Sequence, residues 1–143
     1  MYPEELVLPM RKQLTDQGFS ELKSVHDVDE MISNEGTTLV VVNSVCGCAA
    51  ANARPGAITS LINDKKPDHL TTAFAGVDRD AVEKVRYYLA PFPPSSPAIA
   101  LFKNGELVHM LERHHIEGRS AEMISQNLKG CLLYTSDAAD EVL

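Results

Sequence analysis

The apolar run TTLVVV, from Thr37 to Val42, is the feature that most constrains what this chain can fold into. Its residues are β-branched or leucine, and apolar and polar positions do not alternate. A strand with one solvated face alternates, whereas a strand buried on both faces reads as a continuous apolar run. The run therefore predicts a central strand with helices on both faces of its sheet, which places the chain in the α/β class.

Two helices are predicted before this strand. The first carries Leu6, Met10 and Leu14 at intervals of four residues, and Pro9 should bend it. The second begins after Ser24, whose hydroxyl is a good helix cap. The first pattern is that of an amphipathic helix, and Val25, Val28 and Ile32 follow the cap of the second.

The remaining chain alternates between helical and extended patterns. The dipeptide Asn104-Gly105 is a strong signal for a hairpin turn, and Ser120 is a suitable cap for a last helix that Gly130 should end. Pro55 should bend the helix that contains it. The predicted order is helix 49–62, strand 70–75, helix 78–89, strand 98–102, strand 106–111 and helix 121–128. This order describes a mixed sheet of about four strands, the layout of the thioredoxin fold with extra helices at the start.

Charge and cysteine content narrow the functional classes. The net charge of −7 over 143 residues argues against a nucleic-acid partner, which calls for a basic surface. No segment approaches the roughly 18 apolar residues of a membrane span, and the acidic start does not resemble an export signal. Three cysteines do not form a secreted disulfide framework, so a reducing cytoplasm is the expected compartment. In a reducing cytoplasm, a close pair of cysteines is more often catalytic or metal-binding than structural.

Cys46 and Cys48 stand directly after the central strand, where the next helix begins. Unpaired N–H groups and the positive end of the helix dipole stabilise a thiolate there and lower its pKa. Cys46 comes first and is expected to be the more exposed thiol and the nucleophile, while Cys48 should be less reactive. Gly47 permits a tight turn and leaves the approach to the sulfurs open.

A disulfide between these two cysteines would close a ring of only about 11 atoms, which is expected to be strained. Strained disulfides are easily reduced and therefore oxidising. The pair suits the acceptance or reshuffling of a mixed disulfide better than strong reduction. A small thiol would be a natural agent to discharge it.

A second marker is the segment PSSPAIAL, in which Ser96 and Pro97 precede the third long strand. In thioredoxin-like folds a proline at this point is cis and packs beside the reactive thiol. Pro97 is predicted to do so, and the Ser96-Pro97 edge would then bind substrate. The alternative is that Pro97 only begins an edge strand.

The chain resembles the bacilliredoxin family, bacterial thioredoxin-like proteins that use bacillithiol in place of glutathione, in the segments TTLVVVNSVCGCAAANARPG, PSSPAIALF and RHHIEGRSAEMISQNL. The resemblance implies removal of bacillithiol from mixed disulfides on oxidised proteins, with disulfide isomerase activity as a further implication. Cys46 would be the attacking thiol and Cys48 the resolving or tuning thiol. Bacillithiol would be a co-substrate, bacillithiolated proteins the partners, and no cofactor would be bound.

The resemblance runs from about Glu4 to Leu128, and the sequence GCLLYTSDAADEVL departs from it. One thioredoxin-like domain is therefore expected over residues 1–130, with residues 131–143 as a disordered or non-native tail. Cys131 falls in this tail and receives no catalytic role.

Basic side chains provide the remaining candidates. Arg54, Arg113 and His114 could bind the carboxylates of bacillithiol, although Arg54 could equally be a solvated helix residue. A different class of function stays open, because His114 and His115 could join Cys46 and Cys48 in a tetrahedral zinc site. The rivals to a redox enzyme are thus a zinc or iron-sulfur protein and a non-catalytic scaffold of the same fold.

Overall fold

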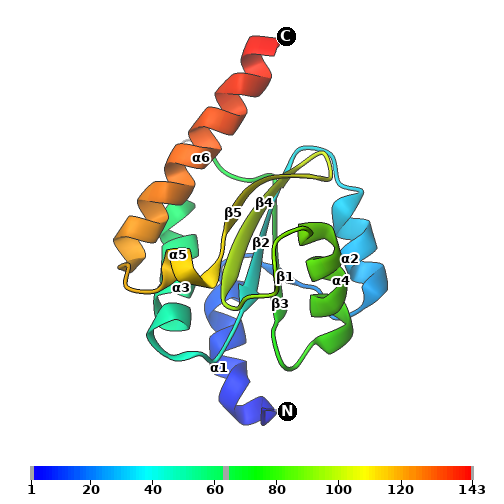
Figure 1. Ribbon diagram of the computed structural model, residues 1–143, viewed down its shortest axis with the longest axis vertical. Coiled ribbons are helices and arrows are strands. Elements are labelled where there is room, and N and C mark those ends of the chain that lie inside the picture. The colour runs from blue at the N-terminus through cyan, green and yellow to red at the C-terminus, as the bar shows by residue number, and fades with distance from the viewer. Residues whose placement is uncertain (1, 63–64, 143) are drawn as a thin grey trace.

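The computed structural model describes residues 2–62 and 65–142, with side chains as far as Leu132. A mixed five-stranded sheet in the order β1-β3-β2-β4-β5 forms its centre (Figure 1). The elements are α1 (Glu4–Thr15), β1 (Ser20–Glu21), α2 (Val25–Ile32), β2 (Thr37–Asn43), α3 (Gly47–Ser60), β3 (His69–Phe74), α4 (Arg79–Leu89), β4 (Ala98–Lys103), β5 (Glu106–Leu111), α5 (Arg113–Ile116) and α6 (Ala121–Val142).

The run from Thr37 forms the central strand, as predicted. β2 pairs in parallel with β3 and antiparallel with β4, and all of its residues are buried. Leu39 and Val41 pack into the core on one face of the sheet, while Val40 and Val42 pack into the core on the other. The missing polar alternation therefore has a direct cause, because neither face of this strand meets water.

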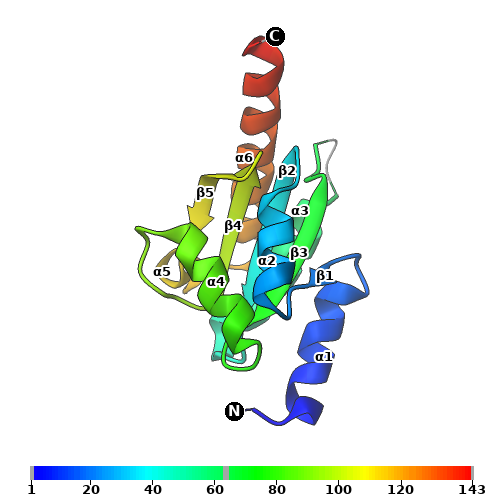
Figure 2. The same cartoon turned by 90° about the vertical axis from the view of Figure 1, so that its right-hand side faces the viewer.

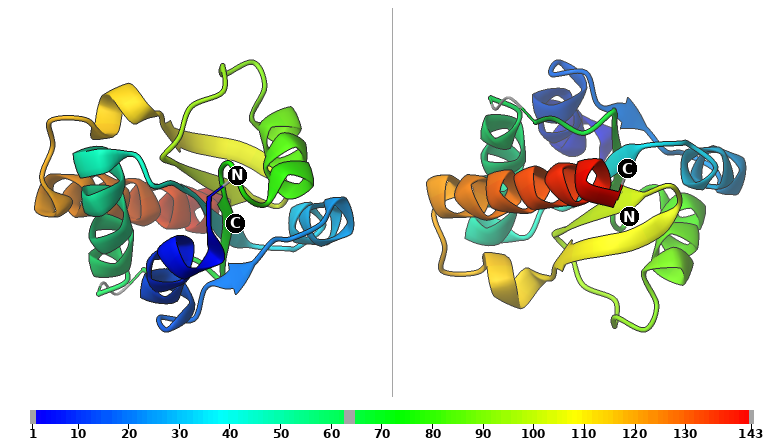
Figure 3. Two further views of the ribbon diagram at one scale, coloured as in Figure 1. Left: turned by 90° about the horizontal axis from the view of Figure 1, so that it is seen from below. Right: turned by 90° about the horizontal axis from the view of Figure 1, so that it is seen from above.

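Helices form a layer on each side of the sheet. The core on one face includes residues of α1, α3 and α6, and the core on the other includes residues of α2 and α4. Figures 2 and 3 show the sheet between these two layers. α3 and α6 pack closely, since a Cβ atom on Gly56 would lie 2.7 Å from Ile124 Cγ2. Only glycine permits this approach.

The buried side of α1 differs from the predicted one. Leu6 is 46% exposed, whereas Val7, Arg11 and Leu14 are buried. Successive intervals of four and three residues follow the helical period of 3.6, and repeated intervals of four drift around the helix. Pro9 lies within this continuous helix.

The hairpin prediction is confirmed. Asn104 and Gly105 have φ values of 50° and 82°, and they join β4 to β5. Two short elements were not predicted, β1 with two residues and α5 with four. Segments of this length carry too few residues to show a period.

The last helix begins where expected, since Ser120 Oγ accepts a hydrogen bond from Met123 N. The prediction that this helix ends at Gly130 was wrong, because α6 continues to Val142. Leu132 is only 2% exposed and belongs to the core beside α3. The domain boundary at residue 130 and the disordered or non-native character of residues 131–143 stay predictions.

In the described part of the chain, no helix combines the length and apolarity that crossing a bilayer needs.

Candidate active site

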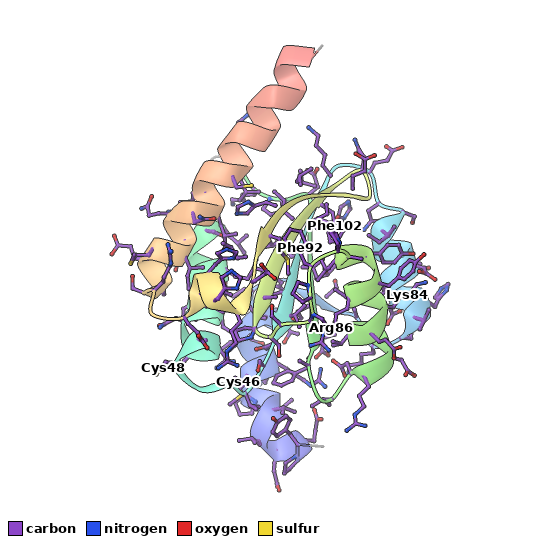
Figure 4. The ribbon with its side chains drawn as sticks, viewed as in Figure 1. Cys46, Cys48, Lys84, Arg86, Phe92 and Phe102 are labelled. Atoms are coloured by element: carbon purple, nitrogen blue, oxygen red, sulfur yellow. The ribbon has the colours of Figure 1, made fainter. Side chains whose placement is uncertain are left out.

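The cysteine pair lies at the amino end of α3, as predicted, and Figure 4 labels both residues there. Cys46 is the cap residue of the helix, and Gly47 is its first residue. Gly47 has a φ of 52°, which favours glycine, and its N–H donates to Val45 O at 2.8 Å in a tight turn. Apart from its two chain neighbours and the backbone of its own helix, no heavy atom lies within 4 Å of the position that a Gly47 Cβ would occupy. The approach to the turn is therefore open.

The Cys46 sulfur has two hydrogen-bond partners, the Ser44 hydroxyl and the Arg113 guanidinium. Both hold the pKa of Cys46 below its usual value, with Ser44 contributing most, and partial burial opposes them. The predicted direction is thus confirmed, but the leading cause is a neighbouring hydroxyl and not the helix end. Ser44 Oγ also accepts a hydrogen bond from Cys46 N at 3.0 Å, so one side chain holds both the backbone and the sulfur.

The prediction that Cys46 is the more exposed thiol was wrong. Cys46 is half-buried, whereas Cys48 is exposed. Cys46 lies against Ser44 and Arg113, while Cys48 stands in the first turn of α3. The nucleophile candidate is therefore the thiol with polar partners, and exposure does not select it.

Arg113 connects Cys46 to the segment of Ser95, Ser96 and Pro97 that leads into β4. The Ser96-Pro97 bond is cis, as predicted, and Pro97 is buried. Arg113 Nη1 donates to Ser96 O at 3.1 Å, and Arg113 N donates to Ser95 Oγ at 3.3 Å. Since the same guanidinium bonds to the Cys46 sulfur, it brings two segments about fifty residues apart into one site. The Ala90-Pro91 bond is also cis, which was not predicted.

Arg54 holds the residues that directly precede Cys46. It is 6% exposed, so the alternative of a solvated helix residue was wrong. Its Nη1 donates to Ser44 O at 2.8 Å and to Asn43 Oδ1 at 3.0 Å, and its Nε donates to Gln13 Oε1 at 2.6 Å. Asn43 Oδ1 also accepts from Ser44 N at 2.8 Å. The buried guanidinium is thus placed to hold the loop before Cys46, and not to meet a ligand carboxylate as its assignment to substrate binding required.

The predicted zinc ligands do not come together. Among the residues that the structure describes, one group of three or more potential ligands is close enough to share an ion, namely Glu112, His114 and His115. Neither cysteine belongs to it. His115 Nδ1 instead accepts a hydrogen bond from Glu112 N at 3.0 Å and caps α5, while the His114 side chain is 68% exposed.

Two functional residues were missed from the sequence, Ser44 and Asn43. The signal for them is the polar pair that interrupts the apolar run immediately before the cysteines. Both residues are 2% exposed, and buried polar groups need hydrogen-bond partners. Their position suggested a strand end, but not that Ser44 would reach the Cys46 sulfur.

Comparisons with known proteins agree with this geometry. A family described as "Disulphide isomerase" matches residues 2–134. A bacilliredoxin of Cytophaga hutchinsonii is 58% identical over 129 residues, covering 90% of this chain and 96% of the relative. Bacilliredoxin BH1716 of Halalkalibacterium halodurans is 56% identical over 128 residues, covering 89% of each chain.

Solved structures show the same fold at low identity. The thioredoxin-like protein Trxlp of Edwardsiella tarda superposes with a TM-score of 0.56 at 14% identity, covering 76% of this chain and 96% of that one. Mitochondrial thioredoxin 3 of Saccharomyces cerevisiae gives a TM-score of 0.56 at 11% identity, covering 84% and 96%. With the relatives at more than half identity, these findings establish that the chain belongs to the bacilliredoxin family and is a thiol-disulfide oxidoreductase of thioredoxin-like fold.

Proposed function

We propose that this enzyme removes bacillithiol from mixed disulfides on oxidised proteins, with Cys46 as the nucleophile. The observation that carries the proposal is the Cys46 sulfur itself, which the Ser44 hydroxyl and the Arg113 guanidinium hold toward the thiolate form. Thiolate is the attacking species in disulfide exchange. The name shared by the relatives, bacilliredoxin, points to bacillithiol as the small thiol.

In the first step, the Cys46 thiolate attacks the bacillithiol sulfur of the mixed disulfide. A new S–S bond joins Cys46 to bacillithiol, the old S–S bond breaks, and the substrate cysteine leaves as a thiolate that takes a proton from water. The substrate sulfur leaves with the electron pair of the broken bond and is thereby reduced, while the Cys46 sulfur is oxidised to the same extent. The open space around Gly47 leaves room for this approach.

Bacillithiol can then leave Cys46 by two routes. Cys48 can lose a proton and attack the Cys46 sulfur, which closes the small ring and releases bacillithiol as a thiolate; two equivalents of an external thiol must then reduce the Cys46-Cys48 disulfide before Cys46 can react again. Alternatively, an external bacillithiol attacks the adduct and leaves as bacillithiol disulfide, while Cys46 returns to the thiolate. Ring strain should limit the first route, so some mixed disulfide is expected to persist. The reaction needs no bound cofactor, and a reducing cytoplasm would supply the small thiol.

The test is mass spectrometry of the reduced protein after it is mixed with a bacillithiolated protein at equal concentration. Cys48→Ser should retain the bacillithiol adduct on Cys46, and Cys46→Ser should accept none. Added bacillithiol should discharge the adduct. Adducts of equal yield on both variants would contradict the division of labour, and transfer to neither would refute the proposed reaction.

Disulfide isomerisation is a second candidate, favoured by the description of the matching family. The same Cys46 thiolate would attack a protein disulfide in place of a mixed disulfide. The measurement is recovery of activity from a ribonuclease with scrambled disulfides. Recovery that requires Cys46 would support the second activity, and a rate equal to that of Cys46→Ser would exclude it.

A further inference from the structure

Arg113 is partly exposed to solvent, yet it contacts three different parts of the site. Its side chain is 40% exposed, yet its guanidinium bonds to the Cys46 sulfur, to Ser96 O and to the Glu117 carboxylate. The first two partners belong to the reactive loop and to the cis-proline segment. A guanidinium has five donors in a fixed plane, so one group can serve all three partners at once.

We propose that Arg113 is a catalytic residue that contacts the Cys46 thiolate before attack and then receives the carboxylate of an anionic small thiol, and that Glu117 positions it. This inference rests on the proposed function for the identity of that small thiol. It assigns to the site a preference for low-molecular-weight thiols that carry a carboxylate over neutral ones.

The two duties follow from the change of charge on the sulfur. Before attack, the sulfur is an anion, and a hydrogen bond from a cation to an anion is stronger than one between neutral groups. Once Cys46 enters a disulfide, its sulfur carries no charge, and the donor that faced it loses its anionic partner. A carboxylate on the bound small thiol would lie close to that donor, which solvent exposure leaves within reach.

Glu117 is suited to hold the guanidinium in place. It follows the four-residue helix α5, and its N–H donates to Arg113 O at 2.8 Å. Its carboxylate accepts from Arg113 Nε, which leaves the outer nitrogens for Ser96 and Cys46. An arginine side chain has several rotatable bonds, so this contact restricts where its charge can lie. Glu117 touches neither reactive sulfur in the contacts described, and its effect should pass through Arg113.

A purely structural role is the competing explanation. Arg113 could serve only to fasten α5 to the segment of Ser95 and Ser96. In that case its removal would lower the thermal stability without changing how Cys46 discriminates between charged and neutral reagents. The two explanations therefore differ in a ratio of rates and not in the presence of activity.

The experiment compares two alkylating reagents that differ by one carboxylate, iodoacetate and iodoacetamide. Each forms a bond from the Cys46 sulfur to carbon and releases iodide. The ratio of their rates reports the local attraction for an anion, and the pH profile with iodoacetamide reports the thiolate. Both would be measured at Cys46 by mass spectrometry on the full chain, in the background Cys48→Ser.

Arg113→Met should lower the iodoacetate-to-iodoacetamide ratio by about fivefold or more, and it should move the iodoacetamide profile to higher pH. Arg113→Lys should give intermediate values, because it keeps the charge but loses the forked donors. Glu117→Ala should lower the ratio less than Arg113→Met, and Glu117→Gln should restore most of it, since its amide oxygen can still accept from Nε. Arg119→Met is the matched control, an exposed arginine on the same connection, and should leave the ratio unchanged.

An unchanged ratio in both Arg113→Met and Arg113→Lys would overturn the proposal, even if both proteins lose stability. A full effect of Glu117→Gln, equal to that of Glu117→Ala, would refute the positioning role of Glu117. Neither reagent contains bacillithiol, so the result is independent of whether the enzyme acts on bacillithiolated proteins. Failure of the proposed function and failure of this inference are therefore distinguishable.

Discussion

Two buried arginines, Arg11 and Arg54, are each 6% exposed, yet their surroundings are opposite. Arg11 meets carboxylates, with both outer nitrogens 2.9 Å from the Asp78 oxygens and Nη1 2.7 Å from Glu21 Oε1. The hydrogen-bond partners of Arg54 are neutral, namely the side-chain amides of Gln13 and Asn43 and the backbone carbonyl of Ser44.

The pKa values respond accordingly. The hydrogen bond to Asp78, more than any other contact, raises the pKa of Arg11, whereas burial lowers the pKa of Arg54. Arg11 joins α1 to β1 through Glu21 and to the cap residue of α4, Asp78. These two carboxylates neutralise its charge within the scaffold. Among the hydrogen bonds of the described residues, those of Arg54 go to no carboxylate, and its guanidinium lies beside the loop that carries Cys46. The carboxylates around Arg11 connect elements of the scaffold, whereas Arg54 connects α1 to the residues directly before Cys46 through neutral partners.

The largest expected effect comes from breaking the carboxylate cluster. Arg11→Met should lower the free energy of unfolding by about 3 kcal/mol, because it leaves the nearly buried Asp78 carboxylate without its cation. Urea denaturation followed by circular dichroism measures this loss. Below the unfolding transition, the alkylation rate of Cys46 should match that of the unchanged protein. A loss under about 1 kcal/mol would show that the carboxylate cluster around Arg11 contributes little to the stability of the fold.

Arg54→Met should cost less, about 2 kcal/mol, because it removes hydrogen bonds and not the partner of a buried anion. It should nevertheless slow the alkylation of Cys46 near neutral pH, unlike Arg11→Met. The reason is that Ser44 O and Asn43 Oδ1 lose their common donor, so the loop holding Ser44 is released. The contrast would fail if both arginine variants slowed Cys46 equally.

Ser44→Ala tests the leading cause of the lowered pKa of Cys46. Because that pKa is depressed, thiolate persists as the pH falls, and removing the hydroxyl should raise the pKa and shift the alkylation profile to higher pH. The rate at pH 6 should fall about fivefold, while rates well above the usual cysteine pKa should converge. Ser33→Ala, which removes an exposed hydroxyl remote in sequence, is the control. An unshifted profile would assign the thiolate to Arg113 alone.

The smallest effects should come from the outermost partners of the two arginines. Gln13→Ala and Glu4→Ala each remove one contact at the surface, to Arg54 Nε at 2.6 Å and to Arg11 Nε at 3.4 Å. Each should lower the free energy of unfolding by about 0.5 kcal/mol or less. Salt should weaken the Glu4 contribution and leave that of Gln13. Thermal unfolding at low and high salt compares the pair, and equal salt responses would argue against this distinction.

Most of the fold could be predicted from the chain, because it depends on local patterns. The unbroken apolar run to Val42 indicated a strand covered on both faces, and Asn104-Gly105 indicated the hairpin. The cysteine pair after that strand indicated the redox site, and Pro97 is cis as expected. The short β1 and α5 were missed since they are held by pairing and capping, and the continuation of α6 past Gly130 was missed because packing of Leu132 outweighs a weak helix stop.

What the sequence determined by itself was therefore the class of fold, the position of Cys46 at a helix start and the family to which the chain belongs. Only the tertiary structure decided which thiol is shielded, that Ser44 and Arg113 share its sulfur, and that Arg54 is buried behind it. The physical reason is the separation along the chain between the residues that determine each feature. A period or a turn is set by neighbours along the chain, whereas a hydrogen bond from Arg113 to Cys46 depends on β5 and β2 lying on either side of β4 in one sheet.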